Sequence, residues 1–165
     1  MVTFPDGFTL YESRAICKYL AKKYTFSLLP ADSDVKAAAL FDQAQSVETL
    51  YFAESAGRIA FEMFAKRYMG LPPDNAVVSE AVRAVEGFFD IAERLLQSRN
   101  CMAGDEFTLV VIYYIPLIQR LFACGYDHLI VSCAAVNAWW GRCMDRPAIQ
   151  VMLAADKEAA AAASK

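Results

Sequence analysis

Histidine and cysteine often act as nucleophiles, bases or metal ligands, but their spacing in this sequence supports none of these roles. His128 is the only histidine, so no pair of imidazoles can form a metal site or a relay. The five cysteines are scattered without a C-x-x-C pair, and their number is odd. We therefore predict no metal site, no disulfide framework, and cysteines that are reduced and buried.

Composition excludes several classes of protein. Hydrophobic residues make up 57% of the 165 residues and charged residues 21%, so the chain is too apolar to be disordered. The net charge is −3 and no block of basic residues occurs, so nucleic acid is not an expected partner. The longest apolar run, residues 109–118, contains Pro116 and is too short to span a membrane. The N-terminus lacks a secretory signal, so we expect a cytosolic protein.

Any reactive side chain must be positioned by a short strand and a series of helices. Residues 8–11 are a β-prone run after the turn dipeptide Asp6-Gly7. Residues 12–24 have a helical pattern with lysines near its end. Residues 25–34 contain Pro30 and lack periodicity, which is typical of a linker.

Two long helices are predicted after the linker. The first covers residues 35–68, and we place its apolar stripe at Leu40, Ala44, Val47 and Tyr51. The second covers residues 76–98 and has one clear apolar stripe. Their short connection predicts that the two helices pack antiparallel.

The last third of the chain is also predicted to be helical. Residues 108–124 are apolar nearly all round, which indicates a central buried helix. Another helix is expected over residues 135–144 with its Trp139-Trp140 pair, and a short one begins at Pro147. The alanine-rich tail is expected to be a frayed helix.

Three ordered motifs resemble those of the cytosolic glutathione transferases, most closely the phi class and its fungal members. Residues 6–16 are similar to the family pattern D-G-x-x-L-x-E-S-x-A-I. Residues 103–109, followed by Pro116, are similar to the family pattern A-G-D-x-F-T-L and the proline that comes after it. Residues 136–147 are similar to the later helices of the family's helical domain. The resemblance implies a mainly α fold. Residues 1–24 would be a remnant of a thioredoxin-like α/β domain, consisting of a short strand and a helix. Residues 25–34 would be a linker, and residues 35–165 a helical bundle.

The resemblance also implies a binding site for glutathione, which would be a co-substrate and not a cofactor. Glu12 would bind the ammonium group of the γ-glutamyl end, and the Ser13 hydroxyl with the first N–H groups of the helix would hold its carboxylate. The alternative is that these two residues simply cap a helix. The residue that stabilises the glutathione thiolate in the family would lie upstream of Met1, so no catalytic residue is expected in this sequence.

Aromatic residues of the long helices are candidates for a second subsite. By resemblance, Phe52, Tyr113 and Tyr114 would help to wall a pocket for an electrophilic, apolar co-substrate. Ordinary core packing is the alternative for each of them.

Thr108 is predicted to be the N-cap of the buried helix. The family has T-x-x-D here, a capping box in which the Asp reaches back to the cap residue. Val111 stands in the place of that Asp, so half of the box is lost. We expect Thr108 alone to cap the helix.

Two functions from different classes remain open at this point. The first is the conjugation of glutathione to electrophilic apolar compounds. We expect this activity to be impaired here, because the thiol-activating residue is missing. The resemblance also implies a homodimer, since members of the parent family form one. The second is a non-catalytic interaction module, as in the gamma subunits of translation elongation factors. An exposed apolar patch is expected near Phe4, Phe8, Ile16 and Leu20.

Overall fold

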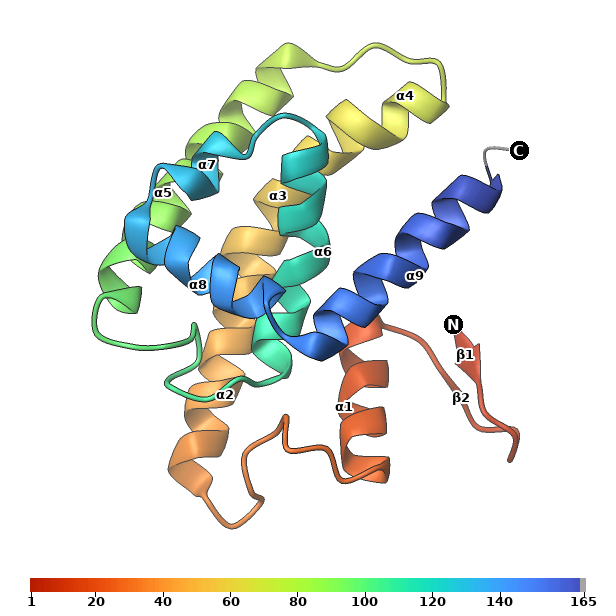
Figure 1. Cartoon of the computed structure of the whole chain (residues 1–165), viewed down its shortest axis with the longest axis vertical. Helices are drawn as coiled ribbons and strands as arrows, with labels where there is room; N and C mark the ends of the chain where they lie inside the picture. The colour runs from red at the N-terminus through yellow and green to blue at the C-terminus, as the bar shows by residue number, and fades with distance from the viewer. Residues whose placement is uncertain (164–165) are drawn as a thin grey trace.

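The computed structural model describes residues 1–163 and is mainly helical (Figure 1). The chain begins with two short antiparallel strands, β1 (Val2–Thr3) and β2 (Thr9–Leu10), with Val2 opposite Leu10. Gly7 has a φ of 84° in the turn between them, a conformation that favours glycine. The strand expected at residues 8–11 is present, but β1 carries too short an apolar run to be foreseen from its sequence.

Helix α1 (Ser13–Lys23) packs beside this hairpin through aromatic rings. The Tyr19 ring lies 4.7 Å from that of Phe4 and 5.3 Å from that of Phe8, centroid to centroid. Phe8 is 44% exposed, but Phe4, Ile16 and Leu20 are half-buried. The expected apolar patch is therefore smaller than predicted, because the hairpin folds back onto α1.

The long helix predicted over residues 35–68 is one helical path with two π-helical segments. It comprises α2 (Val35–Val47), η1 (Glu48–Ala53), α3 (Glu54–Ala60), η2 (Phe61–Ala65) and α4 (Lys66–Tyr68). The predicted buried stripe was wrong: the buried side chains lie one residue further along the helix than predicted. Leu40 is 50% and Tyr51 64% exposed, and the buried residues are Phe41, Glu48, Phe52, Ala56, Ile59 and Glu62. Both stripes have helical spacing, so periodicity alone could not choose between them.

Helix α5 (Asn75–Leu96) runs antiparallel to α3 and matches its predicted stripe (Figure 1). The Asp74 carboxylate caps it by accepting from the N–H groups of Ala76 and Val77 at 2.9 and 3.3 Å. Its buried side chains face the core: Val78, Ala81, Val85, Phe89, Ala92 and Leu96. This prediction is confirmed, and the other positions of the helix are mainly polar, with Ile91 as an exposed apolar exception.

The central helix is α6 (Leu109–Ala123), as its all-round apolarity predicted. A short helix, α7 (His128–Val131), precedes α8 (Ala134–Met144). The Glu93 carboxylate of α5 accepts from the N–H of Ala135 at 2.8 Å and of Val136 at 3.0 Å. A side chain from another helix therefore caps α8 in place of a local residue.

Helix α9 (Pro147–Ala163) is longer than the short helix predicted at this position. Proline suits the first position of a helix, because its fixed φ fits and no N–H bond is lost there. Alanine has the highest helix propensity, so the alanine-rich residues continue this helix. The alanine-rich tail therefore belongs to this longer helix, which continues to Ala163.

Thr108 occupies the N-cap position of α6, but its hydroxyl does not cap the helix. Its Oγ1 is buried and has no hydrogen-bond partner among the described residues. The N–H of Leu109 instead donates to the carbonyl of Leu28 at 2.9 Å, and that of Val111 to the Thr108 carbonyl at 3.1 Å. The N–H of Val111, which an N-cap hydroxyl could take, is therefore bonded to a backbone oxygen, and the predicted cap is corrected.

Replacing Thr108 by valine is expected to leave stability unchanged or to raise it by up to about 1 kcal/mol, because a buried unpaired hydroxyl is removed. Urea unfolding measures the change. Asp74→Ala is the matched control, since that carboxylate does cap a helix and its loss should cost about 1 kcal/mol. A cost of similar size for Thr108→Val would mean that the hydroxyl caps α6 in solution.

No helix among residues 1–163 is long and apolar enough to cross a membrane. The five cysteines are unpaired, with Cys101 and Cys143 buried and the other three half-buried.

Candidate functional site

Glu12 and Ser13 lie where β2 passes into α1, and both are exposed. Glu12 has φ 68° and ψ 112°, which is rare for a residue other than glycine. Such a conformation costs of the order of 1–3 kcal/mol and persists only where the surroundings hold it. The backbone is therefore strained at the residue that the sequence motif singled out.

Arg14 connects this strained segment to the helical bundle. Its guanidinium donates to the Glu48 carboxylate through Nε at 2.8 Å and through Nη2 at 2.7 Å. The Glu48 side chain is fully buried on η1, and the hydroxyl of Thr49 also donates to it at 3.3 Å. Two parallel bonds between guanidinium and carboxylate fix direction as well as distance.

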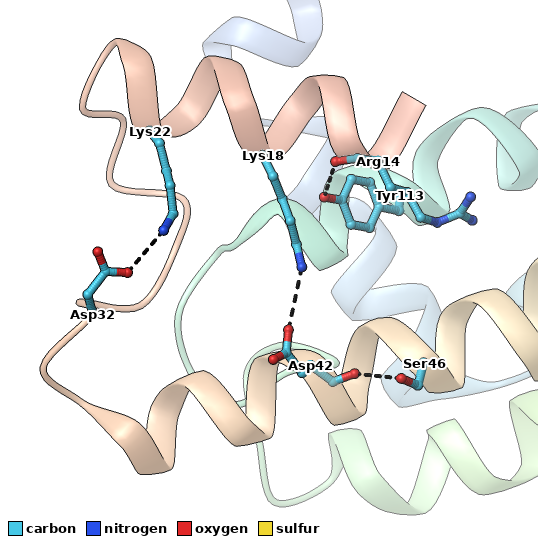
Figure 2. A network of polar contacts seen from close by, with 7 residues as sticks. All are labelled: Arg14, Lys18, Lys22, Asp32, Asp42, Ser46 and Tyr113. Carbon is cyan, nitrogen blue, oxygen red and sulfur yellow. Dashed lines mark hydrogen bonds and ion pairs between the residues drawn. The ribbon is translucent and has the colours of Figure 1, made fainter. Parts of the chain in front are cut away.

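A second contact holds the backbone of the same residue. The Tyr113 hydroxyl of α6 donates to the Arg14 carbonyl oxygen at 3.3 Å, as Figure 2 shows. Burial raises the pKa of Tyr113 well above its ordinary value, so the hydroxyl keeps the proton that it donates. Figure 2 also shows two outer ion pairs of α1, Lys18 with Asp42 and Lys22 with Asp32, at 3.4 and 3.1 Å. Helix α1 is thus anchored at its first turn by a pair whose carboxylate is fully buried, and further on by more exposed pairs.

The helix-cap interpretation of the Glu12-Ser13 pair is not supported by this geometry. Glu12 stands at the N-cap position without a side-chain cap bond, and Ser13 is the first helical residue, one position too late to cap. The arrangement leaves an exposed carboxylate beside a hydroxyl and a helix N-terminus. A carboxylate can accept from an ammonium group, and a helix N-terminus favours a negative group.

The aromatic residues predicted to wall a second subsite lie in different surroundings. Phe52 is fully buried, with its ring 5.3 Å from that of Phe88 and 4.9 Å from that of Tyr114. Tyr113 anchors α1 as described. Tyr114 lines an open, mainly apolar cavity of about 290 Å³ between α2 and α5, to which Phe52 and Tyr113 do not contribute. For Phe52 the structure therefore shows core packing.

Arg14 and Glu48 were missed as site residues by the sequence analysis. They are 34 residues apart, and an acid inside a long helix is normally a solvent-exposed residue. The arginine within the motif at residues 6–16 was the one available signal. Among residues 1–163, no group of three His, Cys, Asp or Glu side chains could hold a metal ion.

Comparison with known proteins identifies the family. The family described as "Glutathione S-transferase, C-terminal domain" matches residues 50–147, which is more than half of the chain. The chain belongs to the glutathione S-transferase family. This confirms the resemblance and the mainly α fold.

Relatives of this glutathione S-transferase family member come from fungi and plants. It is 36% identical to glutathione S-transferase hmp2 of Hypomyces subiculosus over 138 residues, covering 82% of this chain and 65% of that protein. It is 30% identical to glutathione S-transferase 1 of Zea mays, covering 92% and 70%. Glutathione S-transferase I from maize, solved with an atrazine glutathione conjugate, superimposes with a TM-score of 0.84 at 29% identity, covering 90% of this chain and 69% of that one.

The chain spans about two thirds of the length of these relatives. The matched family region covers α3, α5, α6 and α8, which form the helical bundle, and begins after Glu12, Ser13 and Arg14. For this chain, the activity of a whole transferase is therefore a proposal.

Proposed function

We propose that this protein binds glutathione through Glu12 and Ser13. The Glu12 carboxylate accepts from the ammonium group of the γ-glutamyl end, and the Ser13 hydroxyl with the first N–H groups of α1 holds its carboxylate. The observation that carries the proposal is the strained, exposed Glu12, whose side chain does not cap the helix and whose segment is anchored by Arg14.

The proposed reaction is the attack of the glutathione thiolate on an electrophilic apolar compound, with glutathione as co-substrate and no cofactor. Solved relatives hold a glutathione conjugate of atrazine and lactoylglutathione. In this proposal residues 1–24 belong to the glutathione-binding domain, 25–34 form a linker, and 35–165 belong to the helical domain. Five unpaired cysteines suit a reducing compartment, so we propose the cytoplasm.

Calorimetric titration of the full chain with glutathione tests the site. Glu12→Ala is expected to weaken binding about 10–100-fold, because a charge-assisted hydrogen bond is lost. Asp32→Ala is the control: it removes another exposed acid near α1 and should leave the affinity unchanged. An unaltered affinity in Glu12→Ala would place the site elsewhere. Absence of binding by the unmodified chain would favour the interaction-module alternative.

A homodimer is proposed through the apolar face formed by α2, η1 and α5. Leu40, Val47 and Ile91 line the cavity between these helices, and Tyr51 lies exposed further along the same stripe. An exposed apolar surface of this kind is typical of a protein–protein contact. Burial in a second copy would explain why two neighbouring stripes of one helix are both apolar.

Sedimentation velocity tests the dimer. Ile91→Glu is expected to shift the protein to monomer, because it places a charge in the contact, and Ile91 is exposed enough for the fold to tolerate it. Phe61→Glu is the control, since Phe61 is also well exposed, at 50% against 60% for Ile91, but lies on η2. A monomeric unmodified chain would contradict the proposal.

A further inference from the structure

Two buried cysteines line one cavity at the end of α8. The cavity of about 380 Å³ lies between the loop that precedes α6 and the junction of α8 with α9. Cys101 comes from the loop and Cys143 from α8, with Trp139, Arg142 and Arg146 around them. The other three cysteines of the chain do not line this cavity. Of the five thiols, these two are the ones that share a site.

Hydrogen bonds hold the loop that carries Cys101 against α8. Arg142, the neighbour of Cys143, donates through Nη2 to the carbonyl oxygen of Asn100, the neighbour of Cys101, at 2.8 Å. Cys101 and Gly104 form a backbone bridge, with N···O distances of 2.7 and 3.2 Å. Because both ends of the loop are fixed, Cys101 stays beside the end of α8.

A third contact holds the loop beyond this bridge. The guanidinium of Arg146 lies 3.8 Å from the centroid of the Phe107 ring. Residues before and after the Cys101–Gly104 bridge are therefore tied to the same end of α8 and the start of α9.

The two thiols also sense the same charges. The pKa of Cys143 is raised to about 12, chiefly by burial and also by the charge of Cys101, against the opposing effect of Arg142 and Arg146. Burial likewise raises the pKa of Cys101, and the same two arginines lower it. Both cysteines are protonated at neutral pH, and Cys101 is the more accessible, at 9% against 2% exposed.

We propose that Cys101 and Cys143 form a redox-responsive pair that a hydroperoxide converts to a disulfide. The Cys101 thiol loses its proton and attacks the peroxide; the O–O bond breaks, an S–O bond forms, and the alcohol or water leaves. The Cys143 thiolate then attacks the Cys101 sulfur, the S–S bond forms, and the hydroxyl departs as water. The peroxide is reduced and two thiols are oxidised. A small thiol reverses the reaction by exchange.

The disulfide would tie the loop at the start of α6 to the end of α8. A cross-link that closes a loop of this length is expected to raise the thermal unfolding midpoint by roughly 5–10 °C. Oxidation is expected to be slower than that of an exposed cysteine and faster at alkaline pH, because the thiolate is the reacting form. The proposal is independent of glutathione binding, so its failure and that of the proposed function are distinguishable.

Treatment of the full chain with hydrogen peroxide at mildly alkaline pH, followed by non-reducing peptide mapping, tests the pair. We expect the loss of two hydrogens, a peptide joining Cys101 to Cys143, and reversal by dithiothreitol. Cys143→Ser should instead accumulate a sulfenic acid on Cys101 that dimedone traps. Cys124→Ser is the matched control and should form the disulfide as the unmodified chain does.

Non-reducing peptide mapping of the unmodified chain tests the Cys101–Cys143 disulfide even if a cysteine variant fails to fold. Further oxidation of Cys101 without a cross-link, or a cross-link through other cysteines, would overturn the proposal.

Discussion

Replacing Arg14 by alanine is expected to lower the free energy of unfolding by about 3–5 kcal/mol. The change leaves the Glu48 carboxylate fully buried without the guanidinium that bonds to both of its oxygens. Removing one partner of a buried pair costs more than the pair itself contributes, because an uncompensated charge remains in the interior. Chemical denaturation followed by circular dichroism measures the loss.

Two further variants separate burial from charge. Lys22→Ala removes another ion pair of α1, but Lys22 and Asp32 are largely exposed, so the expected cost is about 0–1 kcal/mol. Arg14→Met combined with Glu48→Leu removes both charges and should recover most of the stability. If Arg14→Ala costs no more than Lys22→Ala, the pair is not buried in solution.

Replacing Glu93 by alanine is expected to cost about 2–3 kcal/mol, the second largest effect. The Glu93 carboxylate accepts from the N–H groups of Ala135 and Val136, which begin α8 and have no other cap. The substitution leaves these donors unpaired and removes a negative charge from a helix N-terminus. Hydrogen exchange at Ala135 and Val136 should accelerate, and urea unfolding should report the loss.

Controls on the same helix make this prediction specific. Glu86→Ala changes an exposed acid of α5 and is expected to alter stability by less than about 0.5 kcal/mol. Glu93→Gln keeps one acceptor oxygen and should lose less than Glu93→Ala. Equal stability of Glu93→Ala and Glu86→Ala would mean that α8 starts without this cap.

The order of the helices follows from local patterns. Helix α5 was predicted with its buried residues because its one apolar stripe is flanked by polar side chains. The stripe of the long helix was misplaced because Leu40 and Phe41 each begin an apolar series, and the buried series contains the charged Glu48. A buried acid can be recognised only with its partner, and Arg14 is 34 residues away.

The candidate site was also predictable only in part from the local sequence. The motif at residues 6–16 indicated Glu12 and Ser13, but no pattern in it predicts the positive φ of Glu12 or the anchor that holds it. Thr108 was correctly placed at the start of α6, yet its hydroxyl makes no cap bond, and the N–H of Val111 bonds to the Thr108 carbonyl instead. Local sequence therefore specifies which residue stands at a helix end, and tertiary contacts specify what bonds to it.

Motifs and periodicity were thus sufficient for the family and for the order of the main helices, because these depend on residues close together in the chain. Folding alone brought Arg14 to Glu48, Glu93 to the start of α8, and Cys101 and Cys143 into the lining of one cavity. The members of each of these pairs are more than 30 residues apart, and each pair involves at least one charged or titratable side chain that local patterns assign to solvent or to an apolar core. Their pairing depends on burial, which only the packed helices provide.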